Sequence, residues 1–593
     1  MIDYDKFRSL PAMFFAVAAE RGDRPFLWAK RGGVYQPLSW TDAAHTVNRL
    51  ARGLAALGVA PGDRVALAAE NRPEWALADL AIMSAGGITV PAYTTNTVDD
   101  NRHIFGNSGA RIVLASKPPV SERAAAAAAL LPNVQAVIVM EGRTPAEVRT
   151  WEELLALGDA QADDIAARID ALGPDDIACI IYTSGTGGLP KGVLATHRNI
   201  LANCRGAYHL LEMLGLGDEV FLSFLPLSHS YEHTAGLMFP ISIGAQIYFA
   251  EGADSLAANL LEARPTIMTA VPRLYETMHQ RIRRGIERET GLKRRLFEKA
   301  VTLGQKRLAG EPHGFGERLL DPLLEKLVRD KVRARFGGRL KAMVSGGAPL
   351  NPEIGSFFLA LGVQLLQGYG QTEAAPVISC NPPGAIQVDS VGPALRGVEI
   401  RIAEDGEILV AGDNVMKGYW NDPEATARTL ADGWLRTGDI GYLDPHGYLR
   451  ITDRKRDFIK NSGGDMIAPA KIEGALTLQP EIAQAMVFGD QRPHLVAILV
   501  PDPEFAGQFA PSGADLATLT DNPALISALG DVVSRVNAAL PPIERVRRFV
   551  IASEAFTTAN GQLTPTLKIK RHIVRAVYRD ALDALYEMKT AAA

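Results

Sequence analysis

The sequence is poor in cysteine and has no long apolar run. Its three cysteines, Cys179, Cys204 and Cys380, are far apart and form no CxxC pair. That spacing argues against a disulfide framework or a zinc site and fits a reducing compartment. The N-terminus MIDYDKFRSL carries two acids and lacks the apolar core of a secretory signal. The longest mostly apolar stretch, Gly236 to Ala250, is shorter than the roughly 20 residues that a spanning helix needs. We therefore expect a cytoplasmic protein.

The chain also lacks a strong charge of either sign. Its formal net charge is -5, so composition gives no general attraction to nucleic acid. One region departs from this balance, because residues Arg273 to Arg339 contain 18 Lys/Arg against 9 Asp/Glu in a helical pattern. This basic excess leaves two alternatives open: a peripheral contact with the inner membrane surface, or a solvated helical face.

What the chain does contain is the alternation of strands and helices that is typical of an α/β protein. RVALAAE predicts a buried strand at Arg64 to Glu70, and PEWALADLAIMSAGG predicts a helix after it. ARIVLAS and VQAVIVM predict further strands, and the alanine run at Ala124 to Ala129 predicts a helix between them. We expect an α/β fold with helix-covered, mostly parallel sheets in a large N-terminal domain, and a small α+β C-terminal domain.

The domain bounds follow from shifts in this pattern. At 593 residues the chain is too long for one compact core. The strand and helix alternation lasts to about residue 450, which predicts an N-terminal domain at 1–452 with a helical insertion at 273–339. The pattern of strands and helices then changes, because the strands AMVFGD and LVAILV are followed by a closing helical segment. This change predicts a C-terminal domain at 453–593.

A glycine-rich loop follows the apolar strand predicted at Ile177 to Tyr182. It comprises Thr183, Ser184, Gly185, Thr186, Gly187 and Gly188, and it leads into Pro190, Lys191 and Gly192. Glycines let backbone N–H groups approach an anion, hydroxyls add donors, and Lys191 adds positive charge. These are the parts of a phosphate cradle, although the GxxxxGK[ST] spacing of a Walker loop is absent. The alternative is a flexible surface turn.

Six further segments carry polar residues in patterns that are weak or moderate when taken singly. His229 alone fits a core histidine, Glu373 a helix-end acid, and TGD at 437–439 a tight turn. The segments are LPLSHSYEH (225–233), SGGAPL (345–350), QGYGQTE (367–373), GWLRTGDIG (433–441), DRKRDFIKNSGGDMIAPAKIE (453–473) and LTPTLKIKR (563–571).

Together with the glycine-rich loop, and in this order, these segments resemble the adenylate-forming, AMP-binding superfamily over nearly the whole chain. The helical insertion is similar to that of bacterial long-chain fatty acyl-CoA synthetases. Two positions depart from the usual family pattern. Gly187 stands where the family usually has a second threonine, which removes one hydroxyl from the phosphate loop, and Asp465 stands where a glutamate is usual.

The resemblance implies roles for named residues. Lys568 would be the catalytic lysine, with Lys570 as the competing assignment. The small α+β C-terminal domain would be mobile, and Arg456 would be its hinge within 453–457. Thr372 would contact the α-phosphate, His229 would lie near the acyl group, and Glu373 with Thr186 would hold Mg²⁺, a cation that prefers oxygen ligands. The implied nucleotide-binding residues are Thr183, Ser184, Gly185, Thr186, Gly187, Gly188, Lys191, Gly346, Gly347, Ala348, Gly368, Tyr369, Gly370, Asp439 and Arg454.

The implied reaction is ATP-dependent activation of a long-chain fatty acid to an acyl-adenylate, followed by transfer to coenzyme A as co-substrate. Mg²⁺ is the implied metal, and neither nucleic acid nor a fixed oligomeric state is implied, so monomer and homodimer both stay open. Three alternatives also stay open: a fatty acyl-AMP ligase that serves a carrier protein, an aryl-acid CoA ligase, and a non-catalytic acyl or nucleotide sensor.

Overall fold

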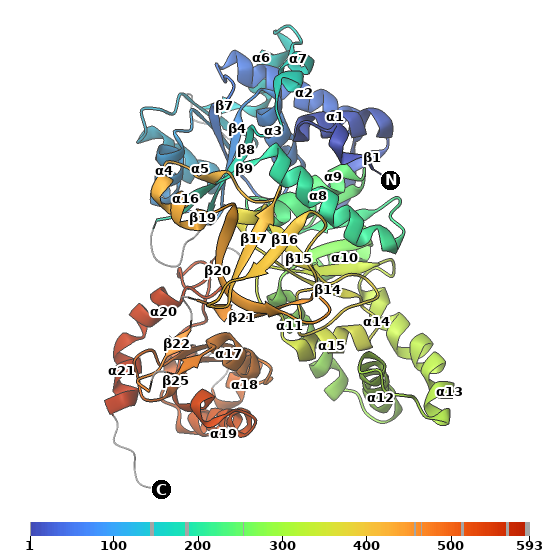
Figure 1. The fold of residues 1–593 in the computed structure, drawn as a ribbon, viewed down its shortest axis with the longest axis vertical. Coiled ribbons are helices and arrows are strands. Elements are labelled where there is room, and N and C mark those ends of the chain that lie inside the picture. The colour runs from blue at the N-terminus through green and yellow to red at the C-terminus, as the bar shows by residue number, and fades with distance from the viewer. Residues whose placement is uncertain are drawn as a thin grey trace.

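The computed structural model of the chain describes residues 2–142, 148–183, 189–252, 254–455, 458–463, 465–510, 515–564 and 568–587. Two large sheets dominate the N-terminal part (Figure 1). One has the order β18-β9-β8-β4-β3-β5-β6-β7, and the run from β8 to β7 is parallel. Its strands are β3 (Arg64–Ala68), β4 (Ile88–Ala92), β5 (Ile112–Ala115), β6 (Ala136–Val139), β7 (Arg149–Thr150), β8 (Ile177–Thr183), β9 (Lys191–Thr196) and β18 (Gly418–Tyr419).

The predicted elements of this sheet are confirmed. β3, β5 and β6 coincide with three strands expected from the sequence, because a strand covered on both faces needs a continuous apolar run. The expected helices are α3 (Pro73–Ser84) and α5 (Val120–Ala129), and they pack with α1 (Leu10–Arg21), α2 (Trp40–Ala56), α4 (Val98–Ser108), α6 (Trp151–Asp159), α7 (Ile165–Ala171) and α8 (His197–Leu211). α3 is buried along its whole length.

The second sheet has the order β15-β14-β13-β12-β10-β11-β1-β2. Its central strands are parallel, and its two edge strands, β15 and β2, run antiparallel to their neighbours. The strands are β1 (Pro25–Arg31), β2 (Val34–Ser39), β10 (Val220–Ser223), β11 (Gln246–Phe249), β12 (Ile267–Ala270), β13 (Ala342–Ser345), β14 (Leu365–Gly370) and β15 (Val377–Cys380). The carboxyl ends of β12, β13 and β14 therefore lie side by side.

A smaller antiparallel sheet follows in the chain. It consists of β16 (Val398–Ile402), β17 (Glu407–Gly412), β19 (Leu430–Ala431), β20 (Trp434–Leu443) and β21 (Leu449–Arg454). The register of β20 against β21 places Asp439 opposite Arg454. Two sequence motifs that are separated along the chain thus meet across one strand pair.

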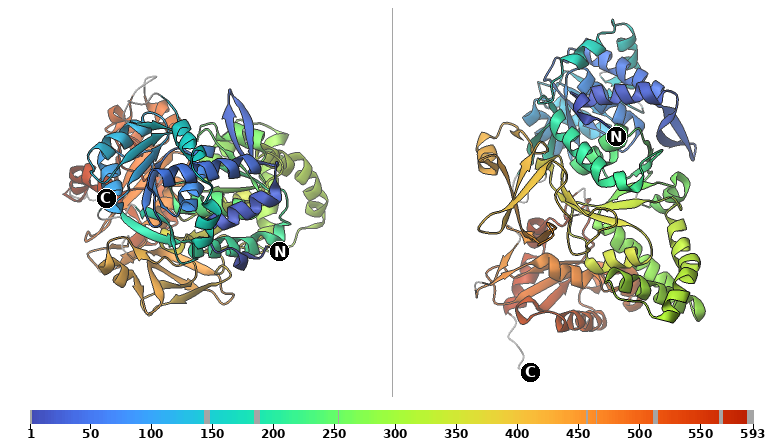
Figure 2. Two further views of the ribbon diagram at one scale, coloured as in Figure 1. Left: turned by 90° about the horizontal axis from the view of Figure 1, so that it is seen from above. Right: turned by 45° about the vertical axis from the view of Figure 1, so that its right-hand side comes forward.

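The segment that was predicted as a helical insertion folds into a bundle of helices at one end of the molecule, drawn in green in Figures 1 and 2. It comprises α11 (Pro272–Glu287), α12 (Leu292–Leu308), α13 (Phe315–Leu324), the π-helical turn η4 (Glu325–Arg329) and α14 (Asp330–Arg335). A core of buried residues joins this bundle to α15 (Pro352–Ala360) and to the second sheet, so the bundle is an integral part of the fold.

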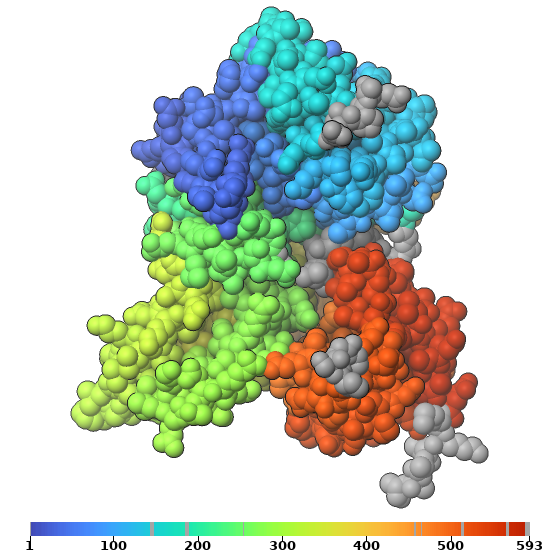
Figure 3. All heavy atoms as spheres, turned by 180° about the vertical axis from the view of Figure 1, so that it is seen from behind, coloured from blue at the N-terminus to red at the C-terminus, as the bar shows by residue number. Residues whose placement is uncertain are grey.

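The C-terminal part has its own apolar clusters, centred on a three-stranded sheet in the order β24-β25-β26. The elements are β22 (Ile459–Lys460), β23 (Met466–Ile467), α17 (Pro469–Thr477), β24 (Ile482–Phe488), β25 (Leu495–Pro501), α18 (Pro503–Ala506), α19 (Pro523–Ala538), β26 (Val546–Ile551), α20 (Arg571–Val577) and α21 (Arg579–Glu587). It lies beneath the N-terminal part and beside the helical bundle (Figures 1 and 3). The expected α/β class, with a large N-terminal and a smaller C-terminal part, is confirmed.

Membrane-crossing helices are absent from the described ranges, since none of the helices there is both long and apolar enough to span a bilayer.

Candidate active site

The predicted phosphate loop joins two antiparallel strands. β8 ends at Thr183 and β9 begins at Lys191, and the register pairs these two residues directly. The predicted residues Ser184, Gly185, Thr186, Gly187 and Gly188 lie outside the described residues. Lys191 Nζ lies 3.2 Å from Asp422 Oδ2 and 5.3 Å from the centre of the Tyr419 ring. The strand pair therefore fixes where the loop begins and ends.

Glu373 and Thr372 lie in a short turn, η5 (Thr372–Ala374), directly after β14. Tyr419 on β18 donates its hydroxyl proton to Glu373 Oε1 over 2.8 Å. Because β18 pairs with β9, the same tyrosine lies against Lys191 and thereby connects the loop lysine to the predicted metal ligand. Thr372 Oγ1 lies 3.0 Å from Ser230 Oγ, which follows the predicted acyl-site histidine in the chain.

Asp439 is shared between two predicted nucleotide-binding residues. Tyr369 donates its hydroxyl proton to Asp439 Oδ2 over 2.5 Å, and Arg454 Nε lies 3.2 Å from Asp439 Oδ1. Burial, together with the Asp439 charge, raises the pKa of Tyr369 well above its ordinary value, so Tyr369 stays a neutral donor. The carboxylate is only 5% exposed. A buried acceptor with one aromatic and one cationic neighbour suits a ribose hydroxyl pair beside an adenine ring.

Local packing also explains why glycines occur at several positions of the predicted nucleotide site. A Cβ on Gly370 would lie 2.0 Å from the Pro376 backbone oxygen, so the close approach of β14 to β15 requires glycine there. A Cβ on Gly346 would lie 2.9 Å from the Tyr231 ring, and Gly347 has a φ of +84°. Gly346, Gly347 and Ala348 directly follow β13, and Gly368 lies in the second half of β14, so all four lie toward the carboxyl ends of neighbouring strands in the second sheet.

His229 and Lys568 are far apart in the chain but lie within electrostatic reach of each other. His229 Nδ1 accepts a hydrogen bond from the Tyr231 backbone N–H over 3.1 Å. Burial, and then the positive charge of Lys568, lowers the pKa of His229 to about 3, so this imidazole is neutral. On either side of residues 565–567, Leu563 and Ile569 form an isolated bridge and the Thr564 N–H donates to the Lys568 backbone oxygen over 2.8 Å. The lysine of the C-terminal part thus lies within electrostatic reach of the N-terminal site.

The described residues provide one carboxylate, Glu373, for a magnesium ion, and not a complete set of protein ligands. Within the described ranges no group of three or more His, Cys, Asp or Glu side chains could hold a metal by itself. Glu373 is a single carboxylate at the base of the phosphate loop, and Mg²⁺ is typically bound by one or two carboxylates together with substrate phosphates. The site therefore fits a magnesium ion that arrives with the nucleotide. Thr186, the other predicted ligand, lies outside the described residues.

Sequence reasoning missed Tyr419 and Ser230. Ser230 lies inside the segment 225–233 that was singled out for its histidine, and a hydroxyl beside a candidate site histidine was the available signal. No pattern in the sequence marked Tyr419 as a site residue, because its hydrogen bond to Glu373 depends on the pairing of β18 with β9. The predicted hinge Arg456 lies outside the described residues.

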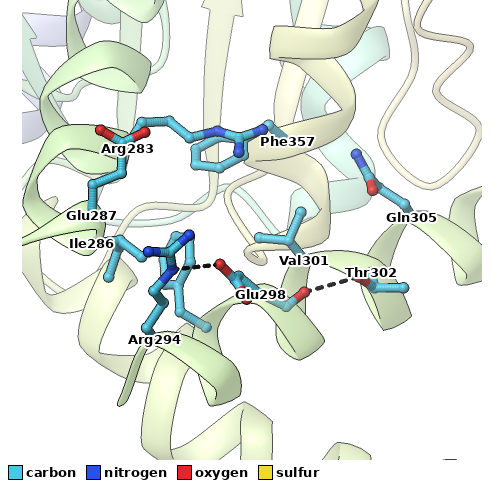
Figure 4. Close-up of a pocket in the computed structure, with 10 residues that line it drawn as sticks. Arg283, Ile286, Glu287, Arg294, Glu298, Val301, Thr302, Gln305 and Phe357 are labelled. Atoms are coloured by element: carbon cyan, nitrogen blue, oxygen red, sulfur yellow. Dashed lines mark hydrogen bonds and ion pairs between the residues drawn. The ribbon is translucent and has the colours of Figure 1, made fainter. Parts of the chain in front are cut away.

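A cavity of about 310 Å³ lies away from these residues, between α11, α12 and α15 (Figure 4). Its lining mixes apolar side chains such as Phe297 and Phe357 with charged ones such as Arg283 and Arg294. Arg283 lies over the Phe357 ring at 5.6 Å, and Arg294 is paired with Glu298. None of the catalytic, nucleotide-binding or metal-binding residues predicted from the sequence lines this cavity.

Comparison with known proteins identifies two family models that together match most of the chain. The model of the AMP-binding enzyme family matches residues 14–420, and that of the AMP-binding enzyme C-terminal domain matches residues 456–590. A long-chain-fatty-acid–CoA ligase, FadD15 of Mycobacterium bovis, is 33% identical over 96% of this chain and 95% of its own. Long chain acyl-CoA synthetase 6, peroxisomal, of Arabidopsis thaliana is 31% identical over 94% of this chain and 82% of its own.

A solved structure shares the fold. The A domain of a carboxylic acid reductase from Segniliparus rugosus, in complex with AMP and a co-purified carboxylic acid, has a TM-score of 0.77 at 25% identity, covering 98% of this chain and 94% of that one.

Proposed function

The chain belongs to the AMP-binding enzyme family, and we propose that it activates a long-chain fatty acid with ATP and transfers the acyl group to coenzyme A. The acid–thiol ligase class follows from the named relatives, which cover nearly the whole chain. The single structural observation that supports catalysis is that Lys568 lies within electrostatic reach of His229, whose neighbour Ser230 contacts Thr372, because this brings a cation from the C-terminal part to the predicted nucleotide site. We also propose the division into domains at residues 452 and 453.

The first half-reaction needs screening of negative charge. The fatty carboxylate oxygen forms a bond to the α-phosphorus of ATP, and the bond from that phosphorus to pyrophosphate breaks. Both reactants are anions, so the reaction depends on positioned positive charge. Lys568 would supply an ammonium group at the α-phosphate, and Lys191 and Thr183 would hold the outer phosphates. A magnesium ion on Glu373 and the phosphates would supply further charge neutralisation.

Nucleotide orientation would come from Asp439. One of its oxygens accepts a hydrogen bond from Tyr369 and the other is ion-paired with Arg454, and bound ribose hydroxyls would replace one of these contacts. Neutral His229 would border the acyl carboxylate without adding a competing charge. In the second half-reaction a thiol attacks the acyl carbonyl, its proton leaves to solvent or a base, and AMP departs as the leaving group.

Pyrophosphate release across a series of acids tests this proposal. The acids run from acetate through laurate, palmitate and oleate to benzoate, each with and without coenzyme A. We expect kcat/KM for C12–C18 acids to exceed that for acetate or benzoate by at least about tenfold, roughly 1.4 kcal/mol, which burial of a few CH₂ groups supplies. A preference for benzoate would support an aryl-acid ligase. Adenylate formation without acyl-CoA product would support a carrier-dependent ligase, and no release with any acid would support a sensor.

We further propose that α13 contacts an anionic membrane surface. Phe315, Leu319 and Leu323 form an i, i+4, i+8 row and are 82%, 68% and 49% exposed. The acids of this helix face inward, where Glu317 binds Lys299 and Lys306, and Asp321 binds Arg307. The outward face is therefore apolar and borders exposed cations, Arg318 and Lys326 among them. An apolar row beside positive charge complements anionic lipid.

Vesicle sedimentation tests the membrane contact. The Phe315→Ser/Leu319→Ser variant should bind phosphatidylglycerol vesicles more weakly than the wild type, while Leu261→Ser, at a 49% exposed leucine on α10 (Leu256–Ala263), should not differ from it. Equal binding of all three proteins, or equal binding to phosphatidylcholine alone, would refute the contact. A dimer that the double variant dissociates would instead assign this face to a second copy of the chain.

A further inference from the structure

α11 contacts the C-terminal part through a row of arginines. Arg284 Nη2 lies 2.5 Å from Asp502 Oδ2, and Arg288 Nη2 lies 2.6 Å from Glu504 Oε1. At the other end of the helix, Arg273 Nη1 donates to the Ala483 backbone oxygen over 2.8 Å. Positions 273, 284 and 288 are separated by about three turns and about one turn of helix, so they share one face. That face is directed at the C-terminal part, which lies beside the bundle (Figures 1 and 3).

The Arg284–Asp502 pair is more than a surface contact. The Asp502 side chain is 8% exposed and that of Arg284 is 27% exposed. Asp502 Oδ1 accepts hydrogen bonds from the Glu504 and Phe505 backbone N–H groups at the start of α18, which leaves Oδ2 for the arginine. A carboxylate fixed in this way presents a defined partner, and charge-assisted contacts of this kind carry orientation as well as attraction.

Asp502 and Lys568 belong to the same packed unit. Asp502 directly follows β25, the central strand of the C-terminal sheet. Arg571, three residues after Lys568, binds Glu473 on α17 and donates to the Val487 backbone oxygen of β24 over 3.2 Å. β24 pairs with β25 along its length. A contact that holds Asp502 against α11 therefore also fixes the position of Lys568.

We propose that Arg284 and Arg288 are positioning residues that hold the C-terminal part where Lys568 faces the nucleotide and acyl site. This inference rests on the proposed two-step function. Adenylate formation needs the lysine at the site, whereas the thiol must later reach the same carbonyl. Ion pairs that are partly exposed can break and re-form at small cost, which suits a contact that is made for one step and released for the next.

Half-reaction assays of single variants test the proposal. ATP–pyrophosphate exchange with palmitate reports the first step, and acyl-CoA formation from supplied palmitoyl-AMP reports the second. Arg284→Gln and Arg288→Gln should lower the exchange rate by about fivefold or more, while the second step keeps its wild-type rate. Arg295→Gln is the matched control, since Arg295 is an exposed arginine on the neighbouring helix α12 of the same bundle. Raised salt should lower exchange in the wild type more than in Arg284→Gln, because charge interactions are screened.

Charge reversal separates positioning from folding. Arg288→Glu and Glu504→Arg should each lower exchange, and the double variant should recover part of it. The pair between positions 288 and 504 is restored with its signs exchanged, whereas the contact of Arg284 with position 504 is not. Asp502 is left unchanged because it also caps α18. Equal loss in both half-reactions with a lowered Tm, or no recovery in the double variant, would overturn the proposal. An active wild type with unaffected variants refutes only this inference, whereas an inactive wild type refutes the proposed function itself.

Discussion

Glu232 is a buried carboxyl whose protonation should make the stability of this protein depend on pH. It begins the π-helical segment η3 (Glu232–Met238) and is fully buried. Its Oε2 accepts a hydrogen bond from Thr269 Oγ1 over 2.6 Å, and the Thr269 and Ser223 hydroxyls oppose part of the pKa rise that burial causes. Burial raises the pKa of Glu232 from 4.5 to about 7. The Glu232→Gln variant replaces this group with a neutral amide of the same shape.

The sign and size of the effect follow from linkage. The unfolded chain loses this proton near pH 4.5, whereas the folded protein keeps it until about pH 7. Stability from Glu232 is therefore fully present below pH 4.5, falls as pH rises, and is lost above pH 7. The total is about 3 kcal/mol, of which about 2–3 kcal/mol falls between pH 5 and 8. At about 2.1 cal/mol/K of unfolding entropy per residue, this corresponds to a Tm change of roughly 2 °C.

The assay compares Tm of the wild type and Glu232→Gln from pH 5 to pH 8.5. We expect the wild-type Tm to fall relative to that of the variant by roughly 2 °C as pH rises, with most of the fall complete by pH 7.5. Other groups act in the opposite direction: burial lowers the pKa of His197 to about 4, so unfolded-state protonation destabilises the fold at acid pH. The difference between two proteins cancels that contribution. A difference in Tm that stays constant across this range would refute the reasoning.

Three further predictions concern the two half-reactions. Lys568→Ala should abolish adenylate formation by removing the ammonium group at the α-phosphate, while acyl-CoA formation from supplied acyl-AMP survives; the reverse result, with Lys570→Ala inactive instead, would move the assignment by two residues. Asp439→Asn should raise KM for ATP at least about tenfold in steady-state assays, since one ribose acceptor is lost, and an unchanged KM would place the ribose elsewhere. Arg456→Pro should leave adenylate formation near normal but reduce acyl-CoA output in single-turnover assays, because proline fixes φ near −65°; equal loss in both steps would contradict a hinge there.

The sequence by itself determined the element types and the order of the motifs. Strands such as β3 and β5 were predictable because burial on both faces demands continuous apolar runs. The helices between residues 272 and 335 were predictable from their periodicity. The assignment of the glycine-rich loop to phosphate binding stays a prediction. These signals are local, since each depends on residues within a few positions of one another.

Only the tertiary structure decided which of these residues meet. Asp439 faces Arg454 because of the register between β20 and β21, and Tyr419 reaches Glu373 because β18 pairs with β9. Lys568 comes within electrostatic reach of His229 in a structure in which the C-terminal part also contacts α11, for example through Arg284 and Asp502. Pairings between residues hundreds of positions apart leave no periodic trace in a single chain. The local composition therefore specified the parts, and long-range packing specified the site.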